Sequence, residues 1–135
     1  MKSARLEGER RTQSAAFPRC YRLTRTDEYS SVFSFRKALK SACFLLHYRP
    51  QGDGQIRKVR LGVVIAKRFL RRAVDRNLFR RLIREVFRKQ RQELPPYDMI
   101  FRLAVKPSFP LDRQAIVAEI QTLLDRLRTI SDIRP

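Results

Sequence analysis

The chain has 135 residues, which is enough for one modest core but not for two. Hydrophobic residues make up 43% and nine of them are Phe, which argues against general disorder. Lys and Arg number 31 against 13 Asp and Glu, a formal net charge of +18. Because such an excess costs free energy through self-repulsion, we expect a polyanionic partner whose neutralised phosphates release counterions.

The composition argues against several other classes of protein. No stretch approaches the ~20 apolar residues of a membrane span. Residues 1–16 lack the apolar core of a secretory signal, and we interpret them as a flexible basic tail. Cys20, Cys43 and His47 give no zinc-type spacing, so we expect two reduced thiols in a cytoplasmic protein. Without a glycine-rich phosphate loop or paired carboxylates, we expect no catalytic residue and no metal ligand in this chain.

The first predicted helix covers residues 26–35. Thr24 or Thr26 can cap it, and two acidic residues suit its first turn. A single face is formed by residues at i, i+3 and i+4, namely Tyr29, Val32 and Phe33.

Two strands are predicted next. Residues 43–49 alternate, so that one face holds Phe44, Leu46 and Tyr48, and the other holds Leu45, His47 and Arg49. We interpret His47 as a structural or surface residue, with a contact role as the alternative. A turn-rich loop at 50–55 leads to a strand at 57–66, and the pair is typical of an antiparallel hairpin.

A strongly basic helix is predicted over residues 72–90. An apolar side is formed by Val74, Leu78, Phe79, Leu82, Ile83 and Val86. Arginines step by four along the opposite side at positions 72, 76, 80, 84 and 88, flanked by Asn77 and Arg81. Since like charges at this spacing destabilise a free helix, we favour an RNA-contacting helix over a merely solvated face or a DNA major-groove helix.

The remaining elements are a strand at 98–106 and an amphipathic helix at 112–128, after which the chain is expected to fray. The resulting order is helix, strand, strand, basic helix, strand, helix. This order favours an α+β two-layer domain, residues 17–130, with helices on one face of one sheet. Residues 131–135 form the frayed C-terminus.

Aromatic side chains recur on the first helix and the first strand. Simple core packing explains them, but an open groove where unpaired bases stack is the alternative, because aromatic rings bind bases of any sequence. The set consists of Tyr29, Phe33, Phe44 and Tyr48.

The segment from Ala66 to Glu85 resembles the arginine–asparagine–arginine motif of the ribonuclease P protein subunit family. The resemblance extends from Phe17 to Arg128. It includes Phe17-Pro18-Arg19 and the Tyr29…Val32-Phe33 spacing. Leu78-Phe79 departs from the family, which has a more basic or polar pair there.

The resemblance implies a small α/β sandwich like the second domain of ribosomal protein S5, with the basic helix in a left-handed crossover. It implies that RNA is contacted by Lys67, Arg68, Arg71, Arg72, Arg76, Asn77, Arg80, Arg81, Arg84 and Arg88. It also implies a cleft for the 5′ leader of precursor tRNA, formed by Tyr29, Phe33, Phe44, Leu46 and Tyr48.

By the same resemblance, the catalyst is the ribonuclease P RNA with bound Mg²⁺, and this chain is a monomer in a 1:1 ribonucleoprotein that assists removal of the leader. Replacing Arg76, Arg80 and Arg84 by Ala should then flatten the salt dependence of binding by roughly two to three units. Two rivals stay open, a general or ribosome-associated RNA-binding protein and a protein nuclease that acts alone.

Overall fold

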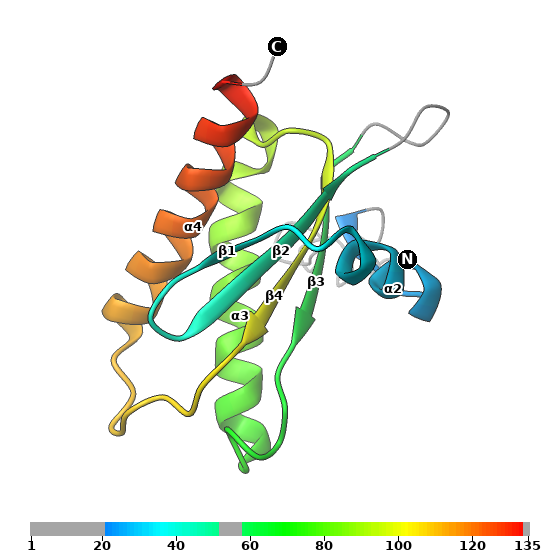
Figure 1. Cartoon of the computed structure of the whole chain (residues 1–135). Helices are drawn as coiled ribbons and strands as arrows, with labels where there is room; N and C mark the ends of the chain where they lie inside the picture. Colours follow the sequence, from blue (N-terminus) through cyan, green and yellow to red (C-terminus); the bar gives the residue numbers. More distant parts are fainter. Residues whose placement is uncertain (1–20, 52–57, 134–135) are drawn as a thin grey trace, which may run out of the picture.

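The computed structural model describes residues 21–51 and 58–133. Within them, a four-stranded sheet and three α-helices make up the fold (Figure 1). The strands are β1 (Ala38–Lys40), β2 (Phe44–Pro50), β3 (Arg60–Val64) and β4 (Tyr97–Leu103). The helices are α2 (Thr26–Phe35), α3 (Ala73–Gln90) and α4 (Arg113–Ile133), with a short 3-10 turn, η2 (Arg91–Glu93), after α3.

The strand order is β1-β2-β4-β3, which makes the predicted hairpin wrong. β2 pairs antiparallel with β1 and β4, and β3 pairs parallel with β4, so the last strand separates the two that were expected to pair. The first five residues of β4 are all buried, whereas β2 and β3 alternate or are half-buried. The strand that is buried on both faces therefore takes an interior position in the sheet, although it comes last in the chain.

The parallel strands β3 and β4 are joined by the basic helix α3. In Figure 1 the two arrows point the same way, β4 lies to the left of β3, and α3 runs back behind the sheet. This connection is left-handed, as the family resemblance implies and against the usual preference for right-handed crossovers.

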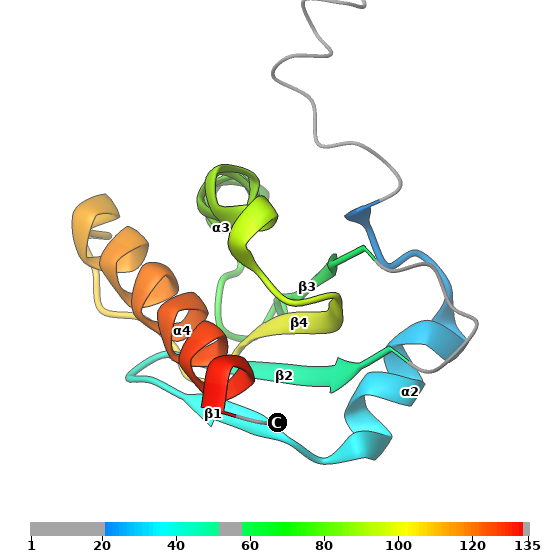
Figure 2. The ribbon, with the colours of Figure 1, turned by 90° about the horizontal axis from the view of Figure 1, so that it is seen from above.

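The main core lies between the sheet and the pair α3 and α4. Its largest fully buried side chains include Phe44, Phe79, Phe87 and Phe101. The helix α2 packs on the reverse face, where Leu23, Val32 and Ile100 form a second, smaller cluster (Figure 2). The α+β sandwich is therefore confirmed, but the expectation that every helix covers one face is wrong.

The bounds of the predicted elements agree closely with the structure, with three differences. β1 was not predicted. β3 and β4 are shorter than expected, and α4 continues to Ile133, so residues 131–133 are helical rather than frayed. At the start of α4, Asp112 accepts hydrogen bonds from the backbone N–H groups of Gln114 (3.1 Å) and Ala115 (3.2 Å). The tail at 1–16, Phe17-Pro18-Arg19, Cys20 and the loop at 52–57 lie outside the described residues.

Candidate nucleic-acid interface

The sequence predicts that the arginines of α3 lie on the side of the helix opposite the core. In the structure they instead lie along the flank of α3. Because each step of four residues advances about 40° around the helix, the series does not keep to one side of the helix. The buried residues of α3 are Phe79, Leu82, Ile83, Val86 and Phe87. Arg76, Arg80, Arg84 and Arg88 are accordingly half-buried, whereas Arg72, Asn77 and Arg81 are exposed.

On this flank, Arg84 is close enough to Arg80 and to Arg22, at the edge of the sheet, for their charges to act on it. Arg22 precedes α2 and forms an isolated parallel bridge with Leu61 on the outer side of β3. Partial burial lowers the pKa of Arg84, and the neighbouring charges of Arg22 and Arg80 lower it further, while Tyr29 acts in the opposite direction. Neighbouring positive charges beside a phenol ring are suited to bind an anionic ligand.

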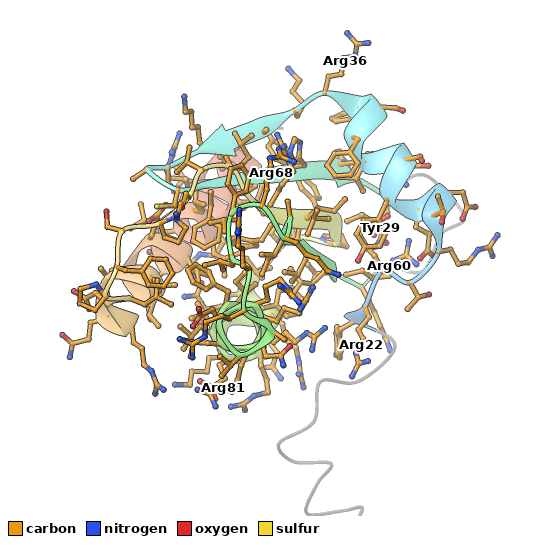
Figure 3. All side chains as sticks on the ribbon, turned by 90° about the horizontal axis from the view of Figure 1, so that it is seen from below. Arg22, Tyr29, Arg36, Arg60, Arg68 and Arg81 are labelled. Atoms are coloured by element: carbon orange, nitrogen blue, oxygen red, sulfur yellow. The ribbon has the colours of Figure 1, made fainter. Side chains whose placement is uncertain are left out.

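Figure 3 shows where Arg22 and Tyr29 lie in the molecule. Arg22, Tyr29 and Arg60 lie on one side of the molecule, near α2 and the edge of the sheet, and Arg81 extends from the outer side of α3. Arg22 carries no local sequence signal for this position, because a long-range strand bridge places it there. The sequence interpretation therefore missed it.

The segment before α3 contributes further cations. Lys67, Arg68 and Arg71 are exposed, and the Arg68 guanidinium lies 4.6 Å from the centre of the Phe69 ring. Arg76 turns back to this segment, and its Nη1 donates to the carbonyl oxygens of Leu70 (2.8 Å) and Arg71 (2.9 Å). Arg76 therefore fixes the shape of the segment, which leaves only its other nitrogens for a ligand.

The face of the sheet beneath α2 is half-exposed and carries aromatic and cationic groups. Phe33 of α2 packs edge-on against His47 of β2, with ring centroids 4.7 Å apart. Arg102 of β4 donates from Nε to His47 Nε2 at 3.3 Å. Burial lowers the pKa of His47, and the positive charge of Arg102 lowers it further, so the imidazole is neutral at pH 7.

This arrangement corrects the predicted cleft. Tyr29 and Phe33 lie on the half-exposed face, but Phe44, Leu46 and Tyr48 are 1%, 0% and 6% exposed in the main core on the other side of the sheet. Successive side chains of a strand point to opposite faces of the sheet, so the three β2 residues face the main core and not the side on which Tyr29 and Phe33 lie. The accessible side of β2 is the one with Leu45 and His47, so the contact role left open for His47 gains support from its position.

An ion-pair network fastens α2 to the sheet. Asp98 is 1% exposed and accepts two hydrogen bonds from Arg60, from Nε at 2.9 Å and from Nη2 at 3.0 Å. Arg60 Nη1 also reaches Glu28 Oε2 on α2 at 2.9 Å. Hydrogen bonds to Asp98 raise the pKa of Arg60. The first turn of α2 is thereby held at a set distance from β3 and β4.

Gly62 of β3 allows α2 to approach the sheet. A Cβ atom at this position would lie 2.8 Å from the Tyr29 ring, closer than real contacts allow. The absence of a side chain at Gly62 therefore lets the Tyr29 ring lie directly on β3, close enough to Arg84 to influence its charge.

Other kinds of site find little support among the described residues. They contain no group of three or more His, Cys, Asp or Glu side chains that could hold a metal ion. None of the helices found in them combines the length and apolarity needed to cross a membrane.

The fold and this surface define a small basic α+β protein that presents gathered guanidinium groups beside half-exposed rings, the chemistry of single-stranded nucleic-acid binding. The model of the family Ribonuclease P matches residues 17–128. The chain belongs to the Ribonuclease P family, and its function is that of the protein subunit of ribonuclease P. A general RNA-binding role without processing is not favoured.

Individual relatives agree with this assignment. The chain is 49% identical over 108 residues to a ribonuclease P protein component of Aromatoleum aromaticum, covering 80% of this chain and 87% of the relative. It is 44% identical over 121 residues to that of Burkholderia mallei, covering 84% and 86%.

Solved structures agree as well. The RNase P protein of Thermotoga maritima matches with a TM-score of 0.66 at 27% identity, covering 78% of this chain and 96% of that one. The Staphylococcus aureus protein matches with a TM-score of 0.67 at 21% identity, covering 84% and 96%, which supports the fold alone.

Proposed function

We propose that the chain binds the catalytic RNA of ribonuclease P through the arginines of α3 and the 5′ leader of precursor tRNA through the face beneath α2. The RNA, with Mg²⁺ bound mainly by its own groups, performs the phosphodiester hydrolysis. The protein acts as a monomer in a 1:1 particle in the cytoplasm. The observation that carries the proposal is the row of half-buried arginines on α3, one of which, Arg84, feels the charges of Arg22, Arg80 and Tyr29, while the Tyr29 ring lies against β3 at Gly62.

Each surface suits its assigned ligand. Exposed and half-buried arginines along one flank neutralise the phosphates of a folded RNA and release its counterions. Half-exposed rings such as Tyr29 and Phe33 stack on unpaired bases without reading their sequence. A leader varies in sequence between precursors, so this is the kind of contact that a single protein needs.

The protein's contribution to the reaction is then electrostatic and positional. Cations between the leader and the RNA reduce the repulsion of the two phosphate backbones, which lowers the Mg²⁺ concentration that assembly requires. Holding the leader along one face also aligns the scissile bond with the RNA.

The test is to add the purified chain to a bacterial ribonuclease P RNA at low Mg²⁺ and to follow 5′ cleavage of a precursor tRNA. We expect cleavage only when both components are present. Cleavage by the protein alone would identify a protein nuclease, and RNA binding without restored cleavage would refute the subunit role.

The leader assignment has its own test. Replacing Phe33 by Ala should weaken the binding of precursor tRNA to the assembled particle by about tenfold, within the range for one stacked base. The binding of mature tRNA, which has no leader, should be unchanged. An equal loss with both ligands would place the leader elsewhere.

A further inference from the structure

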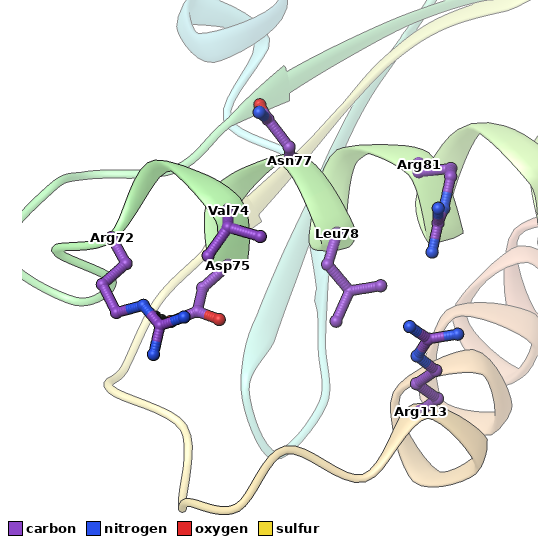
Figure 4. Close-up of a pocket in the computed structure, with 7 residues that line it drawn as sticks. All are labelled: Arg72, Val74, Asp75, Asn77, Leu78, Arg81 and Arg113. Atoms are coloured by element: carbon purple, nitrogen blue, oxygen red, sulfur yellow. Dashed lines mark ion pairs between the residues drawn. The ribbon is translucent and has the colours of Figure 1, made fainter.

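A hollow of about 430 Å³ lies between the start of α3 and the start of α4 (Figure 4). The first two turns of α3 provide one wall, and Arg113 of α4 provides the other. Its volume falls in the range of sites for small organic ligands. The family resemblance implies RNA contacts for Arg72, Asn77 and Arg81 of this lining, but it assigns no role to Val74, Leu78 or Arg113.

Two guanidinium groups from different helices meet across this hollow. Arg81 and Arg113 point toward one another in Figure 4, and neither guanidinium group forms a hydrogen bond or an ion pair with another of the described residues. The carboxylate in the hollow, that of Asp75, lies 3.8 Å from Arg72 Nε. Two like charges that face each other stabilise a bound anion, because its phosphate would relieve their repulsion.

The floor of the hollow is apolar. Val74 is 58% exposed, whereas the other large apolar residues of α3 are buried or half-buried. Leu78 lines the hollow and also packs against the main core, which fixes its position. An exposed apolar surface next to paired cations matches a ligand that combines a phosphate with a flat or apolar body.

We propose that this hollow binds one unstacked nucleotide of an RNA, with its phosphate between Arg81 and Arg113 and its base or ribose against Val74 and Leu78. The inference rests on the proposed function and extends it, because it adds α4 to the RNA interface. It also gives Leu78, which departs from the family pattern, a role as an apolar contact.

A neighbouring hollow extends the path of such a strand. It measures about 190 Å³, shares Arg72 and Asp75 with the first, and is bordered by Lys106 and Phe109. Phe109 is 54% exposed. An exposed ring beside a lysine would support the adjoining base of the same strand.

The experiment replaces Arg113 by Gln in the full chain and measures binding at several salt concentrations. Removing one guanidinium from a phosphate should reduce the slope of log K against log salt by about 0.7–0.9. The matched control is Lys40→Gln, which removes one positive charge from an exposed position on β1, at the far edge of the sheet. The control should leave the slope unchanged.

Two binding reactions distinguish the source of the nucleotide. A reduced slope for the chain binding to ribonuclease P RNA assigns the nucleotide to the catalytic RNA. A reduced slope only for precursor tRNA binding to the assembled particle assigns it to the precursor. Equal slopes for Arg113→Gln and Lys40→Gln in both reactions would overturn the inference.

Two further variants test the geometry of the site. The double variant Arg81→Gln and Arg113→Gln should lose less affinity than the product of the two single losses, since both residues hold one phosphate. Val74→Ala should weaken binding by about fourfold or more without changing the salt slope, because it removes apolar surface only. Multiplicative losses, or no effect of Val74→Ala, would contradict the proposed nucleotide site.

The proposed function and this inference fail in different ways. If the wild-type chain restores cleavage while the Arg113 and Val74 variants behave like the control, only the inference is refuted. If the wild-type chain does not restore cleavage, the proposed function itself is refuted.

Discussion

Asp98 carries a negative charge into the interior between β4 and α2, where an isolated carboxylate would be costly. Its oxygens accept from Arg60, from Gln51 Nε2 at 3.0 Å and from Arg49 Nη2 at 3.4 Å. Two other segments of the chain, the end of β2 and β3, converge on this one side chain of β4. It therefore links the strand order to the position of α2.

We predict that Asp98→Asn lowers the free energy of unfolding by about 3 kcal/mol, because breaking a buried ion pair leaves the partner cations uncompensated. Urea unfolding followed by circular dichroism measures it. The control is Asp125→Asn, whose carboxylate is 54% exposed beside Arg128 and should contribute less than about 1 kcal/mol. Equal losses for the two variants would contradict the role of the network.

His47 gives the protein a pH response that can be followed at a single residue. Burial and Arg102 lower its pKa from the ordinary 6.5, so the unfolded chain binds more protons between the lowered pKa and 6.5. The contribution of His47 to stability is therefore present above pH 6.5 and is lost as the pH falls through this window.

Since His47 is the one histidine of the chain, a proton NMR titration reports its pKa without assignment. We expect a value below 6.5, and a rise toward 6.5 in the variant Arg102→Gln, which removes the second cause of the shift. A midpoint at or above 6.5 in the wild-type chain would show that the imidazole is not held against Phe33 and Arg102.

The residue pattern of β2 correctly predicted which side chains share a face, but not which face is buried and which is accessible to a ligand. The alternation of Phe44, Leu46 and Tyr48 against Leu45 and His47 was predicted correctly, and the error lay in assigning the aromatic face to a groove. A strand whose one face is wholly apolar buries that face first. The mixed face, with a histidine in it, was the signal for the accessible surface.

At the scale of elements, periodicity predicted most of what the structure contains. The bounds of α2 and α3 follow from amphipathic spacing, which is a local property of about ten residues. Strand pairing is not local, so the hairpin expected between β2 and β3 was wrong, and the three residues of β1 gave too short a pattern to detect.

The packing of α2 on the sheet depends on one missing side chain. We predict that Gly62→Ala lowers the free energy of unfolding by about 1–3 kcal/mol, because the new Cβ overlaps the Tyr29 ring and displaces α2. Thermal unfolding measures the loss. Combining Gly62→Ala with Tyr29→Ala should cost less than the sum of the two single losses, whereas strict additivity would show that the ring and the strand are not in contact.

At the scale of the whole molecule, a charge of +18 creates a general attraction to any polyanion, and specific contacts must be separated from it. The sequence-based expectation assigned equal roles to Arg76, Arg80 and Arg84. The structure divides them, because Arg76 hydrogen-bonds the segment before α3, whereas Arg84 is half-buried and feels the charges of Arg80 and Arg22. The salt dependence of binding should reflect this division.

We predict that Arg80→Gln with Arg84→Gln reduces the slope of log K against log salt for ribonuclease P RNA by about 1.4–1.8, the amount for two phosphate contacts. Arg76→Gln should instead lower the free energy of unfolding by about 1 kcal/mol, because it removes the hydrogen bonds to two carbonyl oxygens, and it should change the slope less.

The matched control is Lys37→Gln with Lys40→Gln, which removes the same charge from exposed positions at the far edge of the sheet. If this control reduces the slope as much as the α3 pair does, the attraction is a property of net charge alone and α3 is not the contact surface. If only the α3 pair does so, the left-handed crossover has placed the arginines of one helix where RNA meets the protein.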